Sequence, residues 1–282
     1  MNFFDLHCDT AFECYKQNEE FYVNSLAISG KAGEGFSNWK QTFAVWIRDD
    51  IKNPFETYKE NLNSFKAKLK TAPKNLTSYF AVEGGAVIES DIDKLYELKN
   101  DGIKLLTLTW NGENAIAGGA DSDKGLTDFG KRAIEEMNSL KIGCDLSHLN
   151  SKSFYKAIDI ADFPLASHSN CYFVCPHKRN LTDDKIKLIA KKGGIIGLTF
   201  YPLFLGENVY EKIYENICRL LELGLEENIA IGSDFDGAKM DERLDNISKI
   251  PSLYSFLNQK GLSFGLLDKI FFKNADNFIA KI

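Results

Sequence analysis

The sequence predicts an α/β fold and, within that class, a (β/α)8 barrel. Short apolar runs alternate with helical stretches along the whole 282-residue chain. The runs are rich in Val, Ile, Leu and Phe and nearly continuous, as expected of parallel strands that are buried on both faces. Several runs end in histidine or carboxylate residues, and a barrel gathers such strand ends at one mouth. A doubly wound sheet is the alternative.

Eight apolar runs are the expected strands, and they lie near residues 2–8, 41–47, 78–83, 103–109, 141–147, 164–168, 194–200 and 228–234. Helices with apolar residues at three- and four-residue spacing are expected near 54–70, 91–100, 127–140, 151–161, 182–192, 208–223, 251–259 and 264–281. Pro54 suits a first helical position, and Asp101-Gly102 suits a helix end. No repeat or Pro/Ser-rich linker interrupts the pattern, so residues 1–282 are predicted to form a single domain.

The composition narrows the classes of partner. Hydrophobic residues make up 44% of the chain and charged residues 26%, which is ordinary for a globular protein with a full core. The net charge of −6 argues against nucleic acid or an anionic membrane as the main partner. No apolar stretch is long enough to span a bilayer. No leader is recognised before the first strand, and the cysteines read as free thiols, so a cytoplasmic location is expected.

The prediction of a catalytic function rests on histidine and carboxylate residues at the strand ends. The chain has only 4 histidines, and three of them follow apolar runs. The strand ends carry His7, Asp9, Glu83, Trp110, His148, His168 and Asp234. Residues two apart on a strand face the same way, so His7 and Asp9 should both point inward. These residue types at one mouth are what a hydrolytic metal centre requires, so the barrel is expected to be of the metal-dependent hydrolase type.

Taken singly, each of these groups also has a structural explanation. A His-x-Asp pair or a Ser-His step is more often a hydrogen-bonded interior pair than a ligand pair. Three histidines and three carboxylates at one mouth, however, are unstable unless they are paired or bind metal. A serine nucleophile, Ser147 or Ser167, is the competing catalytic interpretation, but the glycine-flanked elbow that exposes such a serine is missing. No glycine-rich phosphate-binding motif supports dinucleotide or ATP chemistry.

Seven short motifs, spread in order over nearly the whole chain, are more specific together than any single residue. They are Asp5-Leu6-His7-Cys8-Asp9, Val82-Glu83-Gly84-Gly85, Leu106-Thr107-Leu108-Thr109, Asp145-Leu146-Ser147-His148, Ser167-His168-Ser169, Lys178-Arg179-Asn180-Leu181 and Gly232-Ser233-Asp234-Phe235-Asp236-Gly237. In these motifs the chain resembles the membrane dipeptidase (renal dipeptidase) family of zinc peptidases. The resemblance implies a (β/α)8 barrel that binds two zinc ions per chain and hydrolyses dipeptides, often with a D-residue at the C-terminal position.

The resemblance also implies how the metal ions are held. His7 and Asp9 would bind one zinc ion, His148 and His168 would bind the other, and Glu83 would bridge the two. A hydroxide held between the ions is expected to attack the peptide carbonyl. Divalent metals other than zinc remain alternatives for these two sites.

Three further residues take roles from the same resemblance. Asp234 matches the family's proton-shuttling aspartate, and Arg179 matches the arginine that binds the terminal carboxylate of the substrate. Trp110 is a departure, because mammalian members have there a histidine that contacts the reacting carbonyl. An indole donates one hydrogen bond but carries no charge. Trp110 is therefore expected to contact the substrate, with consequences for oxyanion stabilisation and substrate range.

The expected function is a zinc-dependent dipeptidase that acts on small dipeptides. Two alternatives stay open. The first is a dinuclear amidohydrolase for another carboxylate-bearing amide, and the second is a binding protein that has kept the pocket and lost turnover. Members of the family are often dimers, so a homodimer is an expected assembly.

Overall fold

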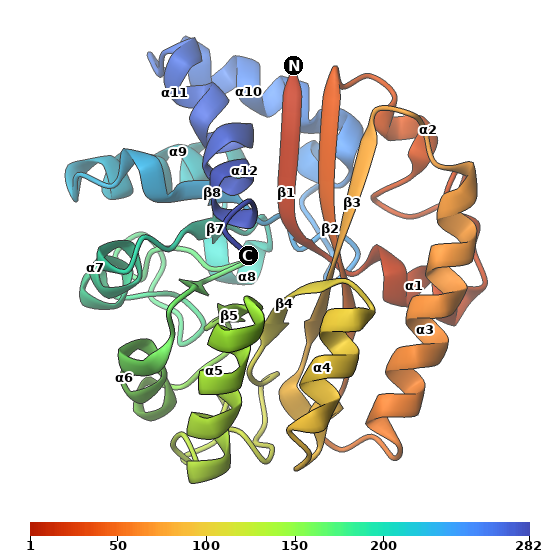
Figure 1. The fold of residues 1–282 in the computed structure, drawn as a ribbon. Coiled ribbons are helices and arrows are strands. Elements are labelled where there is room, and N and C mark those ends of the chain that lie inside the picture. The colour runs from red at the N-terminus through yellow and green to blue at the C-terminus, as the bar shows by residue number, and fades with distance from the viewer.

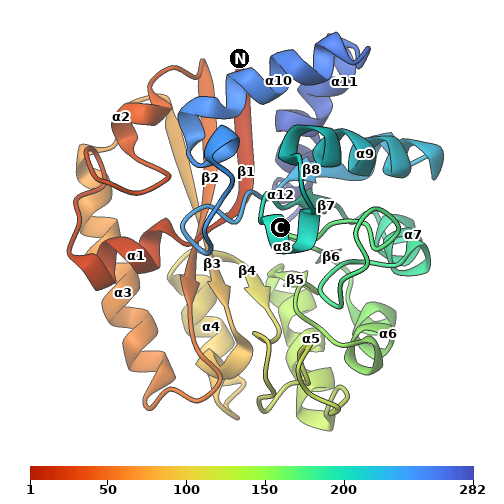
Figure 2. The same ribbon diagram turned by 180° about the vertical axis from the view of Figure 1, so that it is seen from behind.

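The computed structural model describes residues 1–282 and contains a barrel of eight parallel strands (Figure 1 and Figure 2). The strands neighbour one another in the order β6-β5-β4-β3-β2-β1-β8-β7. A parallel bridge between Ala166, directly after β6, and Ile196, the first residue of β7, joins the two ends of this series. The predicted (β/α)8 barrel is confirmed, and the doubly wound sheet is excluded.

The eight strands overlap the eight predicted runs but differ in length. They are β1 (Asn2–Cys8), β2 (Asn38–Trp46), β3 (Leu76–Glu83), β4 (Ile103–Thr107), β5 (Gly143–Asp145), β6 (Pro164–Leu165), β7 (Ile196–Leu198) and β8 (Ile229–Ile231). The first three strands are long, whereas the last four pair over two or three residues only. The side chains that follow these short strands therefore lie on loops at the mouth of the barrel.

Helices cover the outside of the barrel. Seven of them lie close to their predicted positions: α3 (Pro54–Lys68), α4 (Asp93–Asn100), α5 (Asp128–Leu140), α6 (Ser151–Ile160), α7 (Asp183–Lys191), α9 (Val209–Glu222) and α10 (Ile250–Gln259). Three short helices were not predicted: α1 (Thr10–Gln17), α2 (Gly30–Gly33) and α8 (Pro202–Leu205). None of the helices is both long enough and apolar enough to cross a membrane.

The last predicted helix, 264–281, is interrupted. It consists of α11 (Phe264–Asp268), a π-helical turn (Lys269–Lys273) and α12 (Asn274–Ile279). The π turn packs against β1 and β8. Phe272 in this turn and Phe278 in α12 share a buried cluster with Phe4 and Leu6 of β1. The C-terminal segment thus fills one end of the barrel, and the opposite end is left to loops.

Local sequence explains where several helices begin. The Thr127 side chain accepts a hydrogen bond from the Gly130 N–H at 2.9 Å, ahead of α5. The Asn150 side chain accepts one from the Ser153 N–H at 2.8 Å, ahead of α6. Such caps satisfy N–H groups that have no partner within the helix. These caps therefore fix where the loops at the mouth of the barrel end and the outer helices begin.

A shift of register in β1 turns His7 toward the mouth. The pairing of β1 with β2 slips between Asp5 and Cys8. In an unbroken strand, neighbouring side chains lie on opposite faces. Here Leu6 joins the cluster that fills the barrel, and His7 lies next to it in the group of candidate metal ligands. A bulge that re-aims a side chain at a barrel rim accounts for this arrangement.

Candidate active site

Six ionisable side chains converge at the mouth of the barrel, from the ends of β1, β3, β5, β6 and β8. All six are buried: His7, Asp9, Glu83, His148, His168 and Asp234. They form three groups of three whose ligand atoms lie within 4.8 Å of one another: His7–Asp9–Glu83, Glu83–His148–His168 and His7–His168–Asp234. The structure therefore brings together every residue that the sequence predicted as a metal ligand. His7, Glu83 and His168 each belong to two of the groups.

One half of this cluster is rich in carboxylates. His7 Nε2 lies 3.5 Å from Asp9 Oδ2, 3.9 Å from Glu83 Oε2 and 3.9 Å from Asp234 Oδ1. Neither His7 Nε2 nor Asp9 Oδ1 has a hydrogen-bond partner, although both atoms are buried. Leaving buried polar atoms unpaired costs free energy. A divalent cation between them would satisfy both, so these residues fit a metal ion.

The other half is rich in imidazoles. Glu83 Oε1 lies 2.8 Å from His148 Nε2 and 3.3 Å from His168 Nε2, and the two Nε2 atoms are 2.9 Å apart. The opposite ring nitrogens are occupied, because His148 Nδ1 lies 2.9 Å from Asn111 Oδ1 and His168 Nδ1 lies 2.8 Å from Ser167 Oγ. Oxygen partners at Nδ1 leave the Nε2 lone pairs for a metal ion. This half also fits a metal ion.

The two halves differ in electrostatics. Burial disfavours a charged His7, but the nearby carboxylates of Glu83 and Asp9 outweigh it and raise the pKa of His7 to about 10. Burial, followed by Arg179, lowers the pKa of His148. Burial, followed by His7, lowers the pKa of His168. One half therefore attracts positive charge, and the other holds neutral imidazoles.

A buried carboxylate supports the imidazole-rich half from below. Asp145 Oδ1 accepts hydrogen bonds from the N–H groups of Ser147 and Ser167 at 3.0 and 2.9 Å. Asp145 Oδ2 accepts from the Ser167 hydroxyl at 2.6 Å and from the Thr107 hydroxyl at 2.6 Å. The Ser167 hydroxyl also faces His168 Nδ1. Asp145 and Ser167 thus fix the orientation of a candidate ligand. Both residues occur in the sequence motifs, but the motifs gave no indication of this role.

A second buried carboxylate supports the other half in the same manner. Asp5 Oδ1 accepts from the Ser233 N–H at 2.8 Å, and Asp5 Oδ2 accepts from the Ser233 hydroxyl at 2.6 Å and from Gln41 Nε2 at 2.9 Å. The Ser233 hydroxyl also lies 3.2 Å from the main-chain oxygen of His7. Here the serine contacts the backbone of the candidate ligand, not its ring. The only indication of this support in the sequence was the position of Asp5, two residues before His7.

The geometry does not support a serine nucleophile. Ser147 and Ser167 are buried, and neither lines the cavity at the mouth. Ser167 lies between Asp145 and His168, whereas in a catalytic triad the histidine lies between the serine and the carboxylate. These serines hold other residues in place.

The backbone at two of the strand ends is unusual. His148 has φ 71° and Asp234 has φ 65°, values in the left-handed region that residues other than glycine rarely adopt. After β8 the chain passes close to the cluster at Gly237, where a Cβ atom would lie 2.3 Å from Asp9 Oδ2 and 2.6 Å from Asp234 Oδ1. Strained backbone of this kind persists where the surroundings impose it, most often at functional sites.

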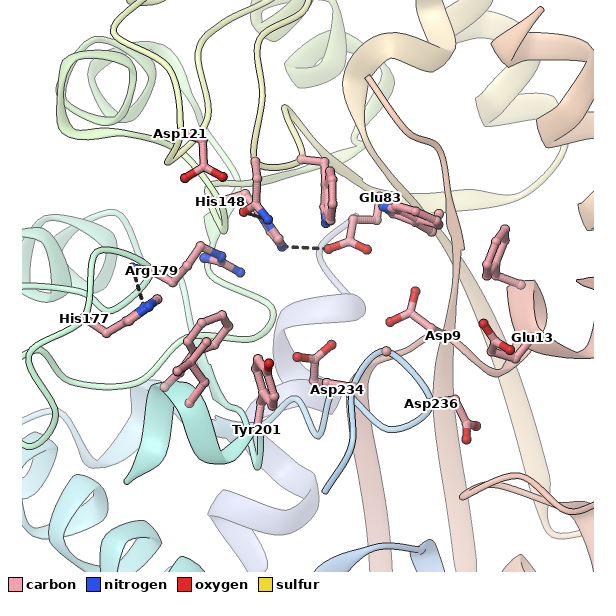
Figure 3. A pocket seen from close by; sticks show the side chains of 18 of the residues that line it. Asp9, Glu13, Glu83, Asp121, His148, His177, Arg179, Tyr201, Asp234 and Asp236 are labelled. Carbon is pink, nitrogen blue, oxygen red and sulfur yellow. Dashed lines mark hydrogen bonds and ion pairs between the residues drawn. The ribbon is translucent and has the colours of Figure 1, made fainter. Parts of the chain in front are cut away.

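A cavity of about 420 Å³ opens above the cluster (Figure 3). Arg179 lines it and is only 5% exposed. Its Nη2 atom lies 3.0 Å from His168 Nε2, and its guanidinium group lies over the Phe204 ring, 5.2 Å from the centroid. Arg179 is therefore not a solvated loop arginine. Trp110, the expected substrate contact, also lines the cavity.

The two ends of the cavity differ in charge. Lys178 and Arg179 line what we call the basic end, together with His177, whose pKa is lowered by burial. Asp9, Glu13 and Asp236 line what we call the acidic end. Figure 3 shows the labelled members of these groups on opposite sides of the cavity. Neighbours already pair with two of them, because Asp121 binds Lys178 and Lys16 binds Glu13. Buried Arg179 has no carboxylate bound to it and faces the cavity.

Two aromatic residues of the cavity, Phe12 and Trp46, were not identified from the sequence. Phe12 lies in the unpredicted helix α1, and Trp46 is the last residue of β2. Trp46 lies beside Glu83 because the two residues are partners in the pairing of β2 with β3. The register between strands decides this placement, and an isolated sequence carries little information on register.

Residues 48–280 match the membrane dipeptidase family, which is peptidase family M19. An uncharacterised protein from the pqqA 5′ region of Klebsiella pneumoniae is 31% identical over 209 residues, which is 68% of this chain and 77% of that protein. An uncharacterised dipeptidase of Schizosaccharomyces pombe is 30% identical over 230 residues, which is 78% of this chain. The match spans only 56% of the length of the yeast protein.

Solved structures agree on the fold. Dipeptidase AC, a metallopeptidase of family M19, superimposes with a TM-score of 0.91 at 23% identity, covering 99% of this chain and 98% of that chain. A metallopeptidase of Rhodobacter sphaeroides with a bound phosphinate mimic of L-Ala-D-Ala gives a TM-score of 0.88 at 21% identity, covering 99% of both chains. These likenesses establish the barrel, and the sequence match over most of the chain establishes the family. The protein belongs to the membrane dipeptidase family, peptidase family M19.

Proposed function

We propose that this protein is a dipeptidase that binds two zinc ions per chain and cleaves dipeptides with free amino and carboxyl ends. The observation that supports this most is the charge polarity of the cavity, with buried Arg179 at the basic end and carboxylates at the acidic end. A dipeptide carries opposite charges at its two ends and matches this polarity. An N-acyl amino acid or a cyclic amide has no free amino group to interact with Asp236, the carboxylate of the acidic end that accepts hydrogen bonds only from the Thr10 hydroxyl and the Ala27 N–H.

The cluster between the two ends is the proposed metal centre. His7 and Asp9 would hold one ion, His148 and His168 would hold the other, and Glu83 would contact both. Two divalent ions bound there would supply an activated water near neutral pH and polarise the scissile carbonyl. The unpartnered His7 Nε2 and Asp9 Oδ1 atoms support this assignment, as does the convergence of the other two Nε2 atoms on Glu83.

Asp234 is the proposed proton carrier. Its carboxylate lines the cavity beside the cluster, and burial raises its pKa to about 6. A carboxylate with a pKa near the working pH can take a proton in one step and return it in the next. We assign to Asp234 the transfer of a proton from the attacking water to the leaving amine.

Arg179 is the proposed anchor for the C-terminal carboxylate of the substrate. A guanidinium group binds a carboxylate through two parallel, charge-assisted hydrogen bonds. Its Nη2 atom is already within 3.0 Å of His168 Nε2, so an anchored carboxylate would lie close to the scissile bond. That closeness would limit the enzyme to dipeptides. Because the R. sphaeroides protein binds a mimic of L-Ala-D-Ala, we include D-residues at the C-terminal position among the proposed substrates.

Substrates with blocked ends test the proposal. Arg179→Ala should raise KM, at a cost of about 2–5 kcal/mol in binding, and Arg179→Lys should recover only part of it because an ammonium group lacks the two-pronged geometry. Amidation of the C-terminus of the substrate should lower the kcat/KM of the wild type far more than that of the Arg179→Ala variant. Equal losses in the two enzymes would show that Arg179 does not bind the carboxylate of the substrate. Equal turnover of dipeptides and of N-acetyl amino acids by the wild type would favour a general amidohydrolase instead.

We also propose a homodimer, by analogy with family members. Light scattering on the purified, metal-loaded protein measures its mass in solution. A mass of one chain at micromolar concentration would contradict this part of the proposal.

A further inference from the structure

Three aromatic side chains form a continuous surface in the cavity. Phe12, Trp46 and Trp110 all line it, and each is partly exposed. Phe12 and Trp46 meet edge-on with ring centroids 5.0 Å apart, and Trp46 and Trp110 meet in a T-shaped contact at 5.1 Å. They come from α1, β2 and the segment after β4, so the fold and not a local motif assembles them. We call this surface the aromatic wall.

Phe12 and Trp46 lie on the side of the cluster away from Arg179, and Trp110 continues the aromatic wall toward His148, with ring centroids 6.5 Å apart. Trp46 is paired in register with Glu83, and Phe12 precedes Glu13 at the acidic end. Figure 3 shows Arg179 and Glu13 on opposite sides of Glu83. A dipeptide whose carboxylate is bound at Arg179, and whose scissile bond lies over the cluster, must therefore extend its N-terminal residue along the aromatic wall.

We propose that the aromatic wall selects dipeptides whose N-terminal residue has a large apolar or aromatic side chain. This inference rests on the proposed function, because Arg179 sets the direction in which the substrate binds. Burial of apolar area favours larger side chains, and aromatic edges and faces add a preference for a further ring. A glycine or alanine at the same position would leave most of the wall in contact with water.

The polar groups near the aromatic wall are consistent with this preference. Lys16 lies over the Phe12 ring at 5.6 Å and pairs with Glu13 at 2.9 Å, so no free cation is present to select an acidic side chain. The indole Nε1 of Trp46 is buried without an acceptor. This polar atom is not exposed to the cavity, so it does not interrupt the apolar surface of the wall. The wall and its surroundings therefore favour apolar over acidic N-terminal side chains.

A series of dipeptides tests the inference on the zinc-loaded protein. The series keeps the C-terminal alanine, in both configurations, and varies the N-terminal residue from glycine through alanine and leucine to phenylalanine. We expect kcat/KM to rise along the series by about tenfold to a hundredfold. Trp46→Ala and Trp110→Ala should each remove most of this rise. Phe204→Ala changes an aromatic side chain beside Arg179, so it should affect all members of the series alike and serves as the matched control.

Folding defects are separated from loss of selectivity by a milder variant and an independent readout. Trp46→Leu keeps an apolar side chain, and its thermal unfolding and metal content are compared with those of the wild type. Inhibition constants of phosphinate dipeptide mimics with a phenylalanine-like or alanine-like N-terminal side chain should show the same preference without turnover. A flat wild-type series, or a rise that survives both tryptophan variants, would overturn the inference and leave the dipeptidase function standing. Failure of the zinc-loaded protein to cleave any dipeptide would overturn both.

Discussion

The two halves of the candidate metal centre rest on matched supports but present different ligands. Below each half, a buried aspartate accepts hydrogen bonds from both the amide and the hydroxyl of a serine on the next strand end: Asp5 with Ser233, and Asp145 with Ser167. Above one support lies a single imidazole among carboxylates. Above the other lie two imidazoles that share Glu83.

This difference shows that the same arrangement, an aspartate that accepts two hydrogen bonds from a serine, serves two purposes. Ser167 connects its aspartate to the ring of His168, at Nδ1, and therefore sets which nitrogen faces the cluster. Ser233 connects its aspartate to the main-chain oxygen of His7 and therefore sets the position of the strand end. The halves should respond differently to substitution and to pH, although both support the same proposed reaction.

The largest effect is expected at Glu83, where the two halves meet. Glu83→Gln keeps the size of the side chain but removes the negative charge that the two halves of the metal centre share. We expect loss of both ions and a fall in kcat/KM of about a thousandfold or more, equivalent to about 4 kcal/mol. Elemental analysis and kinetics on the same sample measure both. Glu13→Gln, a change at the acidic end outside the cluster, should keep both ions. A Glu83→Gln protein that retains two ions would contradict the sharing of Glu83.

The next effect concerns Asp234, which lies near both His7 and His168. Asp234→Asn should keep both ions and lower kcat by about a hundredfold to ten-thousandfold, the range for a positioned proton carrier. Metal content and kcat are measured across the same titration with zinc. If metal and activity are lost together, Asp234 is a ligand of the third group and not a proton carrier.

A smaller effect should separate the two supports. Ser167→Ala should weaken metal binding in the imidazole-rich half by about tenfold to a hundredfold, because His168 loses its partner at Nδ1. Ser167→Thr keeps a hydroxyl and should recover much of the affinity. Ser233→Ala removes the corresponding hydroxyl without touching an imidazole, so metal affinity should stay near that of the wild type. Competition with a chromogenic chelator measures these affinities, and equal losses in the two alanine variants would show that the supports act alike.

The sequence predicted most of the fold because the strands of a barrel are marked by apolar runs. It failed where tertiary contacts override local pattern. The helix α2 has four residues and depends on the Ser29 cap, which binds the Ala32 N–H. The pattern of 264–281 predicts one helix, but the chain takes a π-helical turn where Phe272 packs against the filled end of the barrel.

The candidate ligands were predicted because each lies at the end of an apolar run. Their supports were not predicted, nor were Phe12 and Trp46 of the aromatic wall, because these placements depend on contacts between distant segments. Ser233 reaches Asp5 across 228 positions of the chain, and Trp46 lies beside Glu83 through strand register alone. Residue type and local spacing identify the chemistry at such a site, whereas the pairing of strands decides which neighbours shape it.

The smallest expected effect is a difference in proton release between the halves. The pKa of His7 is raised to about 10 by carboxylates that outweigh its burial, so its ring carries a proton at pH 7 in the metal-free protein. His148 and His168 have lowered pKa values and are already neutral. Because a histidine must be neutral to bind metal, filling the carboxylate-rich half should release about one proton, and filling the other half should release none.

Calorimetry in buffers with different ionisation enthalpies counts these protons during a zinc titration. Zinc affinity in the carboxylate-rich half should rise about tenfold between pH 7 and pH 8, because each bound ion displaces one proton. Affinity in the imidazole-rich half should stay nearly constant over that range. His7→Asn provides the control, since it removes the titrating ring and should abolish the release while the imidazole-rich half still binds its ion. Release of a proton by that variant, or none by the wild type, would mean that the two halves do not differ in charge as their carboxylates and imidazoles imply.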